Sequence, residues 1–371
     1  MKLFILIGVA VFMVHTPIVD AADAPVNIIK DTDIGNDTDD AMALAILHAF
    51  QSRHEANILA VTVSYDNKWA APFADIINIS YGRPDVPIGV VRPGSMPMTP
   101  ENLGILIPKD LLKVLVERRT AAGYFVYPHN ITDGRRAPDA ISLLRMTLAG
   151  QQDEGVVMVQ IGPSTNLARL LATDSDTTSP LDGRALVRRK VRFLSVMAGS
   201  FTDIQYDGRT YPKGHPEYNL QMDVHSAQRV FSDWPTPIVV TDCASAPPRS
   251  AASVERDFAY VATHPILEDL HLYTWTHHAT AGWPEDVTLK WPRSVGFCDE
   301  NAVLYAVRPD EGYFSLSQPG NITVLPDGGS RFEESKTGHE RLLTLTDGQK
   351  QRAGEAMALL RSQPPSTKGR L

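Results

Sequence analysis

Short apolar runs alternate with helix-forming segments over the first two thirds of the chain. The apolar runs are of strand length and lie at residues 27–30, 57–63, 86–91, 155–161, 191–197 and 237–241. Segments of helix-forming composition lie between them, at residues 41–50, 69–81, 137–149 and 164–172. Strands that alternate with helices form a mostly parallel sheet covered by helices on both faces. The pattern therefore predicts an open α/β fold with a mostly parallel central sheet flanked by helices.

The C-terminal part of the chain has a different pattern. Short apolar stretches separated by glycine and proline occupy residues 312–345 and predict a small β-rich C-terminal extension. Residues 349–361 have the composition of a helix, and a polar tail follows them. We expect three parts in all: a leader at 1–22, one domain at 25–345 that includes the β-rich extension, and a helix and tail at 346–371.

The N-terminus has the features of a secretory signal peptide. Lys2 precedes an apolar run at residues 3–14, and Val19 and Ala21 occupy the −3 and −1 positions of a cleavage site. The apolar run is shorter than the roughly 20 residues that a membrane-spanning helix needs. We therefore expect cleavage near Ala21 or Ala22 and export to the periplasm or the exterior. No membrane segment is expected in the mature protein.

Composition and charge narrow the classes of function. Of the 371 residues, 43% are hydrophobic and 21% are charged, which is typical of a folded globular protein and excludes collagen-like and low-complexity chains. The net charge is −8 and the sequence has no long basic run, so nucleic acid is not an expected partner. The two cysteines, Cys243 and Cys298, could form one disulfide or remain thiols.

The segment from Asp31 to Asp40 is the strongest chemical signal. It holds five aspartates in ten residues, after an apolar strand and before a helix-forming segment. Open α/β sheets bind their ligands at this end of a strand. Carboxylates this close repel one another unless a cation or hydrogen-bond donors offset their charge, and ligands that are all oxygen suit Ca²⁺ or Mg²⁺. The alternative is a solvated acidic loop that caps the next helix.

Two known arrangements of aspartates can be compared with this segment. An EF-hand needs glutamate at the twelfth position of its loop, where a loop that starts at Asp31 has Met42. A phosphatase of the haloacid dehalogenase type would use Asp31 as nucleophile and Asp33 as acid. Such a phosphatase would have threonine or valine at the position of Gly35. The EF-hand is therefore excluded, and the phosphatase is disfavoured.

The acidic segment consists of Asp31–Gly35 (DTDIG) followed by Asp39–Ala41 (DDA). It resembles the N-terminal signature of the nucleoside hydrolases, in a version two residues longer than the common one and with isoleucine in place of proline. Further segments resemble this family in the same order along the chain, at residues 59–67, 161–168, 197–199, 217–223 and 298–307. The resemblance spans about residues 26–314. Within it, Asn166 is expected to begin or cap a helix and to lie outside the site.

The resemblance implies calcium-dependent hydrolysis of the N-glycosidic bond of ribonucleosides, which releases the free base and ribose. It also implies that Ca²⁺ is held by Asp33, Asp40 and Asp299 together with the backbone carbonyl of Ile161. Asp33 would in addition act as the general base that activates a metal-bound water. Asp39, the second catalytic residue, would bind the ribose 2′-hydroxyl. Family members are commonly homo-oligomers, so a homo-oligomer is expected here.

By the same resemblance, Asn67, Glu217 and Asn219 would bind the remaining sugar hydroxyls. Such side chains suit a polyol, because each hydroxyl offers one donor and two acceptors. Each position also has an ordinary structural explanation. Asn67 could be only a turn residue, Glu217 and Asn219 could be loop residues, and Asp299 could cap the helix expected at 301–307.

Two departures from the family pattern concern the sugar and the leaving base. Tyr211 stands where many relatives have an asparagine that contacts the sugar, and Cys298 replaces a histidine proposed to assist the base. A thiol with a pKa of about 8.5 is a poor acid for this step. Trp275, His277 and His278 lie in an aromatic segment and are alternative candidates for contacts with the leaving base.

Two other functions stay open at this point. One is a related hydrolase that acts on another ribosyl or glycosyl compound, which the changes at Tyr211 and Cys298 would permit. The other is a non-catalytic protein that binds a nucleoside or a sugar in a metal-dependent manner.

Overall fold

The computed structural model describes residues 24–103, 110–206, 209–247, 249–280, 294–295 and 298–365. The expected leader at 1–22 and the end of the C-terminal tail lie outside these residues. The side chains of Trp275, His277 and His278 also lie outside them, although their backbone belongs to a helix. Within the described part of the chain, no helix combines the length and the apolar character that a membrane span requires.

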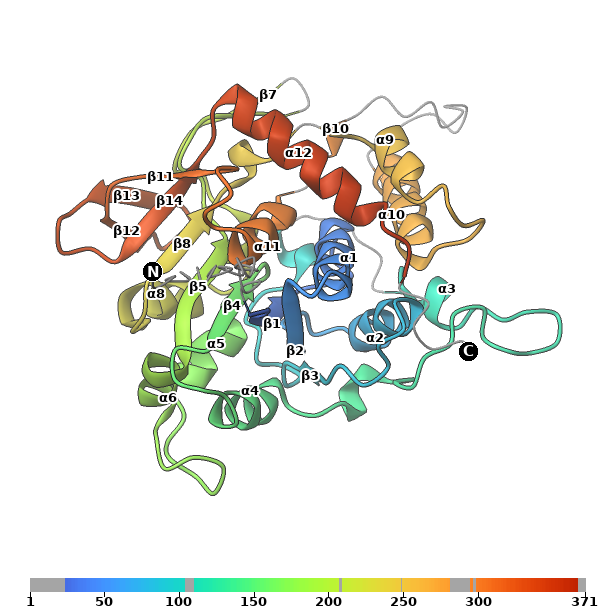
Figure 1. Ribbon diagram of the computed structural model, residues 1–371, viewed down its shortest axis with the longest axis horizontal. Helices are drawn as coiled ribbons and strands as arrows, with labels where there is room; N and C mark the ends of the chain where they lie inside the picture. Colours follow the sequence, from blue (N-terminus) through green and yellow to red (C-terminus); the bar gives the residue numbers. More distant parts are fainter. Residues whose placement is uncertain are drawn as a thin grey trace, which may run out of the picture.

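A ten-stranded sheet forms the centre of the described structure (Figure 1). Its order is β13-β12-β14-β8-β5-β4-β1-β2-β3, and β11 lies beside β14. The strands from β14 to β3 pair in parallel. They are β14 (Glu340–Thr344), β8 (Ile238–Thr241), β5 (Val191–Met197), β4 (Val156–Gln160), β1 (Val26–Thr32), β2 (Ala56–Val63) and β3 (Ile88–Val90). The predicted, mostly parallel central sheet is confirmed.

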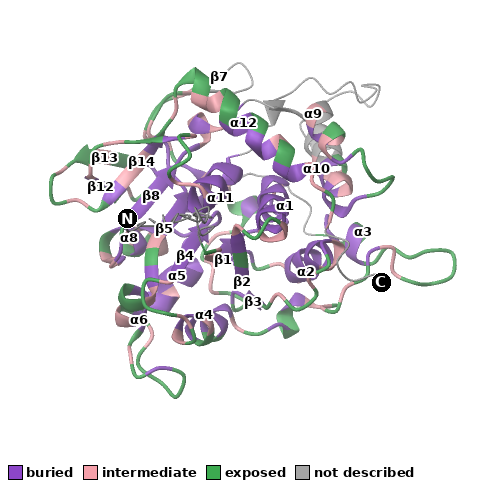
Figure 2. Cartoon of the chain, in the orientation of Figure 1, coloured by how far each residue is buried: buried purple, intermediate pink, exposed green. Residues whose placement is uncertain are grey.

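Strand β4 illustrates why the parallel strands are continuous apolar runs. All its residues are buried. Val157 and Val159 belong to one hydrophobic cluster, whereas Val156 and Met158 belong to another. Successive side chains of a strand point to opposite faces of the sheet, so each face has its own core. Figure 2 shows the central strands as buried between layers of helices.

Helices cover both faces of the sheet (Figure 1). One hydrophobic cluster contains residues of α1 (Asp39–Ser52), α2 (Ala70–Ser80), α11 (Asp299–Val307) and α12 (Asp347–Arg361). The other contains residues of α4 (Ala140–Ala149), α5 (Thr165–Leu171), α6 (Gly183–Lys190) and α8 (Val224–Asp233). The helices expected from the sequence are present, with ends that differ by a few residues.

The β-rich segment expected at 312–345 continues the central sheet. It contains β11 (Ser315–Leu316), β12 (Gly320–Val324) and β13 (Ser330–Glu334), which run antiparallel to their neighbours, and β14. Strand β14 pairs in parallel with β8, so the segment adds an edge to the main sheet. A capping box of Thr346 and Gln349 then starts α12, which returns to pack on α1 and α11.

The remaining elements complete the described structure. The helices among them are α3 (Lys113–Val116), α7 (Tyr218–Met222), α9 (Ala251–Asp257) and α10 (Pro265–Thr280). The 3-10 helices are η1 (Pro100–Leu103), η2 (Gly134–Arg136) and η3 (Cys243–Ser245). Two small antiparallel pairs join β6 (Ile204–Tyr206) to β7 (Arg209–Tyr211) and β9 (Arg249–Ser250) to β10 (Ser294–Val295).

Candidate active site

The acidic loop follows β1 at its carboxyl end and leads into α1. A backbone hydrogen bond of 3.2 Å from the N–H of Asn36 to the carbonyl of Asp33 closes the turn. Gly35 has a φ of +102°, and a Cβ at this position would lie 2.4 Å from Cδ1 of Leu112. Only glycine suits this place, because both the backbone conformation and the neighbouring side chain exclude a larger residue. The loop therefore has a defined shape that places its aspartates.

Four carboxylates converge beside this loop. Asp37, Asp39, Asp40 and Asp299 each contribute an oxygen, and these oxygens all lie within 4.8 Å of one another. Asp39 and Asp40 belong to the first turn of α1, and Asp299 belongs to the first turn of α11. The partial positive charge at a helix N-terminus stabilises carboxylates in these positions. The structure thus brings together Asp40 and Asp299, both of which the family resemblance implies as metal ligands.

The carboxylates of this cluster are close enough to affect the pKa values of one another. Burial, and then the charge of neighbouring carboxylates, raises the pKa of Asp37 and Asp299 well above the usual range. Burial also raises the pKa of Asp40, to about 6. Oδ1 of Asp37 is buried and accepts no hydrogen bond from the described residues. Oxygen donors whose negative charges outnumber the positive charge beside them fit a hard divalent cation such as Ca²⁺.

Asp33, the predicted general base, lies next to the four-carboxylate cluster without being one of its members. Burial is the main cause that raises the pKa of Asp33, followed by the charges of Asp40 and Asp39. Gly162, which follows β4, packs directly against it: a Cβ at Gly162 would lie 2.8 Å from Oδ1 of Asp33 and 2.6 Å from Oγ of Ser64. A side chain at position 162 would therefore displace Asp33, and glycine leaves the space that Asp33 occupies.

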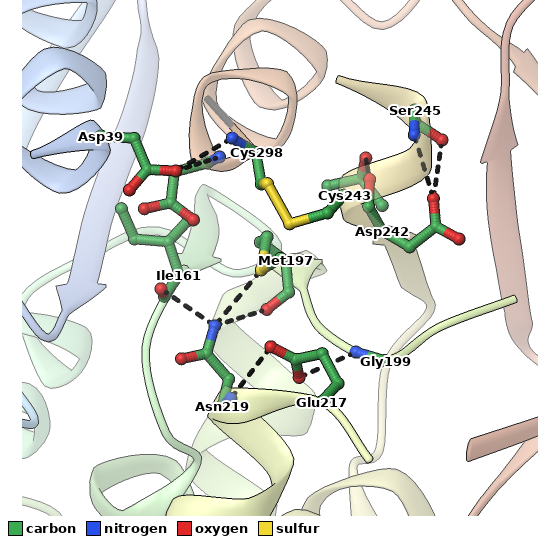
Figure 3. The surroundings of a disulfide bond; sticks show 12 residues. Asp39, Ile161, Met197, Gly199, Glu217, Asn219, Asp242, Cys243, Ser245 and Cys298 are labelled. Atoms are coloured by element: carbon green, nitrogen blue, oxygen red, sulfur yellow. Dashed lines mark hydrogen bonds between the residues drawn. A yellow bond between two sulfur atoms is a disulfide. The ribbon is translucent and has the colours of Figure 1, made fainter. Parts of the chain in front are cut away.

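Glu217 and Asn219 lie on the other side of Ile161 from Asp39 in Figure 3. Glu217 caps α7 and accepts hydrogen bonds from the backbone N–H groups of Gly199 (3.0 Å), Asn219 (2.9 Å) and Leu220 (3.2 Å). Burial raises the pKa of Glu217, and these three donors oppose the rise. Glu217 is therefore an ordered, buried acceptor and more than a loop residue.

The side-chain amide of Asn219 connects two strand ends (Figure 3). Its Nδ2 donates to the backbone carbonyls of Ile161 (3.3 Å) and Met197 (3.2 Å), which follow or end β4 and β5. The carbonyl of Ile161 is the one that the sequence assigned to Ca²⁺. A carbonyl oxygen has two lone pairs, so this hydrogen bond leaves one of them for another ligand.

Asn67 lies in the turn after β2. Its Oδ1 accepts a hydrogen bond of 2.9 Å from the backbone N–H of Trp69, as expected of a turn residue. Asn67 also lines a cavity of about 390 Å³ at the carboxyl end of β2. The same cavity is lined by Tyr65, Trp69, Met96 and Met98, with charged side chains among its other residues. Asn67 thus has a structural role and is also accessible to a ligand.

Cys298 and Cys243 form a disulfide (Figure 3), which settles the pairing that the sequence left open. The bond joins the start of α11 to η3, which follows β8. The backbone N–H of Cys298 donates to Oδ2 of Asp39 at 2.9 Å. As a half of a disulfide, Cys298 has no thiol proton to give to a leaving base. It also occupies the N-cap position of α11, so Asp299 is inside the helix and is not its cap.

Three positions around the acidic loop have contacts that the sequence did not predict. Asp37 is not among the predicted metal ligands, although its carboxylate joins the four-carboxylate cluster. Asn166 was expected only to cap a helix, yet its Nδ2 donates to Oδ2 of Asp31 at 2.9 Å and to the carbonyl of Val63. This contact orients Asp31 inward, away from the role of a phosphatase nucleophile. Lys30, a single lysine in an apolar strand, is fully buried behind the cluster.

The sequence also matches a known protein family. A family model described as inosine-uridine preferring nucleoside hydrolase matches residues 28–359. No curated protein sequence matches the chain.

Several solved structures have a similar fold. A plant nucleoside hydrolase, PpNRh1, is 18% identical over 92% of this chain and 100% of its own, with a TM-score of 0.58. A purine-preferring ribonucleoside hydrolase from Gardnerella vaginalis is 16% identical over 91% of this chain and 98% of its own, with a TM-score of 0.62. An inosine-uridine preferring nucleoside hydrolase from Bacillus anthracis is 15% identical over 90% of this chain and 99% of its own, with a TM-score of 0.59.

Proposed function

Because the chain belongs to the inosine-uridine preferring nucleoside hydrolase family and is thus an N-glycosyl hydrolase, we propose that it cleaves the N-glycosidic bond of ribonucleosides in a Ca²⁺-dependent reaction. The products are the free base and ribose. The observation that carries the proposal is the convergence of Asp37, Asp39, Asp40 and Asp299 within 4.8 Å at the carboxyl edge of a parallel sheet. Open α/β sheets bind their ligands at this edge.

The cation site is proposed around Asp40 and Asp299, with Asp33, Asp37, Asp39 and the carbonyl of Ile161 as further oxygen donors. Ca²⁺ takes six to eight oxygen ligands, which this concentration of carboxylates can supply. A divalent cation bound there orients sugar hydroxyls and lowers the pKa of water. Its charge also opposes the mutual repulsion of the carboxylates, which otherwise favours their protonated forms.

The residues around the cation site have distinct proposed roles. Asp33 takes the proton from the water that attacks C1′, since it lies next to the cluster and is buried. Asp39 accepts a hydrogen bond from the ribose 2′-hydroxyl, since the N–H groups of Cys298 and Asp299 donate to its Oδ2 and hold the carboxylate in place. Glu217 and Asn219 bind other hydroxyls of the ring, on the side of Ile161 that faces away from Asp39 in Figure 3.

The leaving base has a proposed place beside the sugar site. The cavity of about 390 Å³ contains Asn67, a proposed sugar ligand, and the side chains of Tyr65, Trp69 and Met98. Aromatic and thioether side chains form favourable contacts with the faces of nucleobases. Cys298 is bonded to Cys243, so the proton for the base comes from another group. The aromatic segment with Trp275, His277 and His278 is a second proposed contact for the base.

Kinetic assays of the purified protein test the proposal. Ribose release from inosine, uridine, adenosine and cytidine is measured before and after treatment with EDTA, and after addition of CaCl₂ or MgCl₂. We expect EDTA to abolish the activity and Ca²⁺ to restore it. Asp33→Asn should lower kcat by about 10²- to 10⁴-fold, which is the usual contribution of a general base. Asp174→Asn is the matched control, because Asp174 is exposed in the loop between α5 and α6.

Each alternative function gives a different result in this assay. A wild-type protein that releases ribose from no nucleoside contradicts the proposed substrate, and full activity of the Asp33→Asn variant contradicts the proposed mechanism. Calorimetric binding of a nucleoside without turnover indicates a binding protein. Release of a sugar only from other ribosyl or glycosyl compounds indicates a related hydrolase. Recovery with Mg²⁺ and not with Ca²⁺ contradicts the proposed metal.

Export and homo-oligomerisation are also part of the proposal. Cleavage of the leader at 1–22 would place the enzyme in the periplasm or outside the cell. N-terminal sequencing of the protein from a bacterial periplasmic extract should find a start near Asp23, whereas recovery from the cytosol with Met1 intact would contradict export. Sedimentation velocity of the mature protein measures its oligomeric state.

A further inference from the structure

Lys30 occupies a buried position of a central parallel strand, where an apolar residue is usual. It lies in β1, between Ile29 and the acidic loop, and its side chain is fully buried. Lysine is almost never fully buried unless its charge is paired. The described residues that attract its charge are carboxylates of the candidate site, with Asp40 first and Asp299 second. Lys30 therefore lies directly behind the proposed cation site.

The hydrogen bonds of Lys30 lead to one carboxylate of the cluster. Its ammonium donates to Oγ1 of Thr32 at 2.8 Å and to the backbone carbonyl of Asp40 at 3.2 Å. The hydroxyl of Thr32 in turn donates to Oδ1 of Asp40. An ammonium group can only donate, so the Thr32 oxygen accepts from Lys30 with one of its two lone pairs. The proton of Thr32 is thereby directed to the carboxylate of Asp40.

We propose that Lys30 and Thr32 are positioning residues that hold Asp40 in the orientation required for cation binding. This inference rests on the proposed cation site and deepens it. Thr32 occupies one oxygen of the Asp40 carboxylate and leaves the second oxygen to the cation. Partners of this kind, which orient a metal ligand without touching the metal, commonly contribute 10- to 100-fold to metal affinity.

Lys30 has a second effect, through its charge. A divalent cation balances two of the four carboxylates of the cluster. The ammonium of Lys30, which donates to Thr32 and to the carbonyl of Asp40, lies on the side of Asp40 that the cation does not occupy. In the absence of the cation, Lys30 is the positive group that attracts Asp40, Asp299 and Asp33 at once. The folded state without metal should therefore depend on Lys30, and the state with metal should depend on it less.

Variants of Thr32 test the positioning role by calorimetric titration of the full-length enzyme with CaCl₂. Thr32→Val keeps the shape and removes the hydroxyl, and we expect its Kd for Ca²⁺ to rise at least 10-fold at a temperature where the variant is fully folded. Thr32→Ser keeps the hydroxyl and should bind Ca²⁺ as the wild type does. A merely structural role for Thr32 would not separate valine from serine in this way.

Lys30→Met tests the charge by thermal unfolding in EDTA and in excess CaCl₂. We expect a lower melting temperature than wild type in EDTA and a larger increase on addition of Ca²⁺. Lys336→Met is the matched control, because Lys336 is exposed in the turn between β13 and β14. If Lys30→Met does not fold without Ca²⁺, the variants of Thr32 decide the question.

The inference is overturned if Thr32→Val binds Ca²⁺ as tightly as the wild type, or if the wild type binds no Ca²⁺. Failure of the proposed function looks different: the wild type then binds Ca²⁺, and the variants of Thr32 differ as described, but no nucleoside is hydrolysed.

Discussion

The disulfide between Cys243 and Cys298 should make a large contribution to the stability of the fold. It joins two residues that are 55 positions apart in the sequence. Closing a loop of this length in the unfolded chain removes about 14 cal/mol/K of entropy, or about 4 kcal/mol at 25 °C. Replacement of both cysteines with alanine should therefore lower the free energy of unfolding by about 4 kcal/mol. Alanine is chosen because Cys298 is buried and serine would add an unpaired hydroxyl.

Urea unfolding followed by circular dichroism measures this loss. Wild type is compared with the double alanine variant, each with and without a strong reductant, and the reductant should affect only the wild type. A loss below 1 kcal/mol, with an unchanged dependence on urea concentration, would refute the loop-closure argument. A second effect should appear at the site, since the N–H of Cys298 donates to Asp39. The variant should bind Ca²⁺ more weakly than the wild type even where both are fully folded.

Two further predictions concern the position of Asp33 and the pH dependence of stability. Gly162→Ala should lower kcat/KM by about 10²-fold with the fold retained, because the new Cβ would displace the Asp33 carboxylate. Gly348→Ala is the control: its Cβ meets open space, so the steady-state kinetics should be unchanged. Burial raises the pKa of Glu340 to about 7, so its carboxyl stabilises the fold at low pH and loses this contribution between about pH 4.5 and 7. Glu340→Gln should therefore be more stable than wild type at pH 8 by about 1–3 kcal/mol, and equal to it near pH 4.5. Chemical unfolding of both proteins at the two pH values measures this. A difference in free energy of unfolding that is the same at both pH values would contradict the prediction.

The two kinds of evidence, sequence and structure, agree best on the sheet. Strand β4 is buried on both faces, so it has to be apolar at every position, and such a run is visible in the sequence itself. The acidic segment from Asp31 to Asp40 was also evident, because a high density of carboxylates after a strand is a local property. Its resemblance to a family then assigned Asp40 and Asp299 to one site, and the structure places them together.

Other features depend on distances between segments that are remote in the sequence. The disulfide exists because β8 ends beside the N-terminus of α11, which no spacing of Cys243 and Cys298 could reveal. The side chain of Asn166 donates hydrogen bonds to Asp31 and to the carbonyl of Val63 and does not cap its own helix, because α5 begins beside the ends of β1 and β2. Lys30 gave no sequence signal beyond its presence in an apolar strand.

The order of apolar and polar residues along the chain was sufficient to predict the layers of this protein, because burial acts on each strand and helix separately. The same order was not sufficient to predict which residues are partners in the site. A hydrogen bond or an ion pair requires two groups to lie within about 3 Å of each other. Such a meeting depends on how the ends of β1, β4 and β5 and the starts of α1 and α11 are arranged in space. Asp37, Lys30 and Asn166 acquire their contacts only through that arrangement.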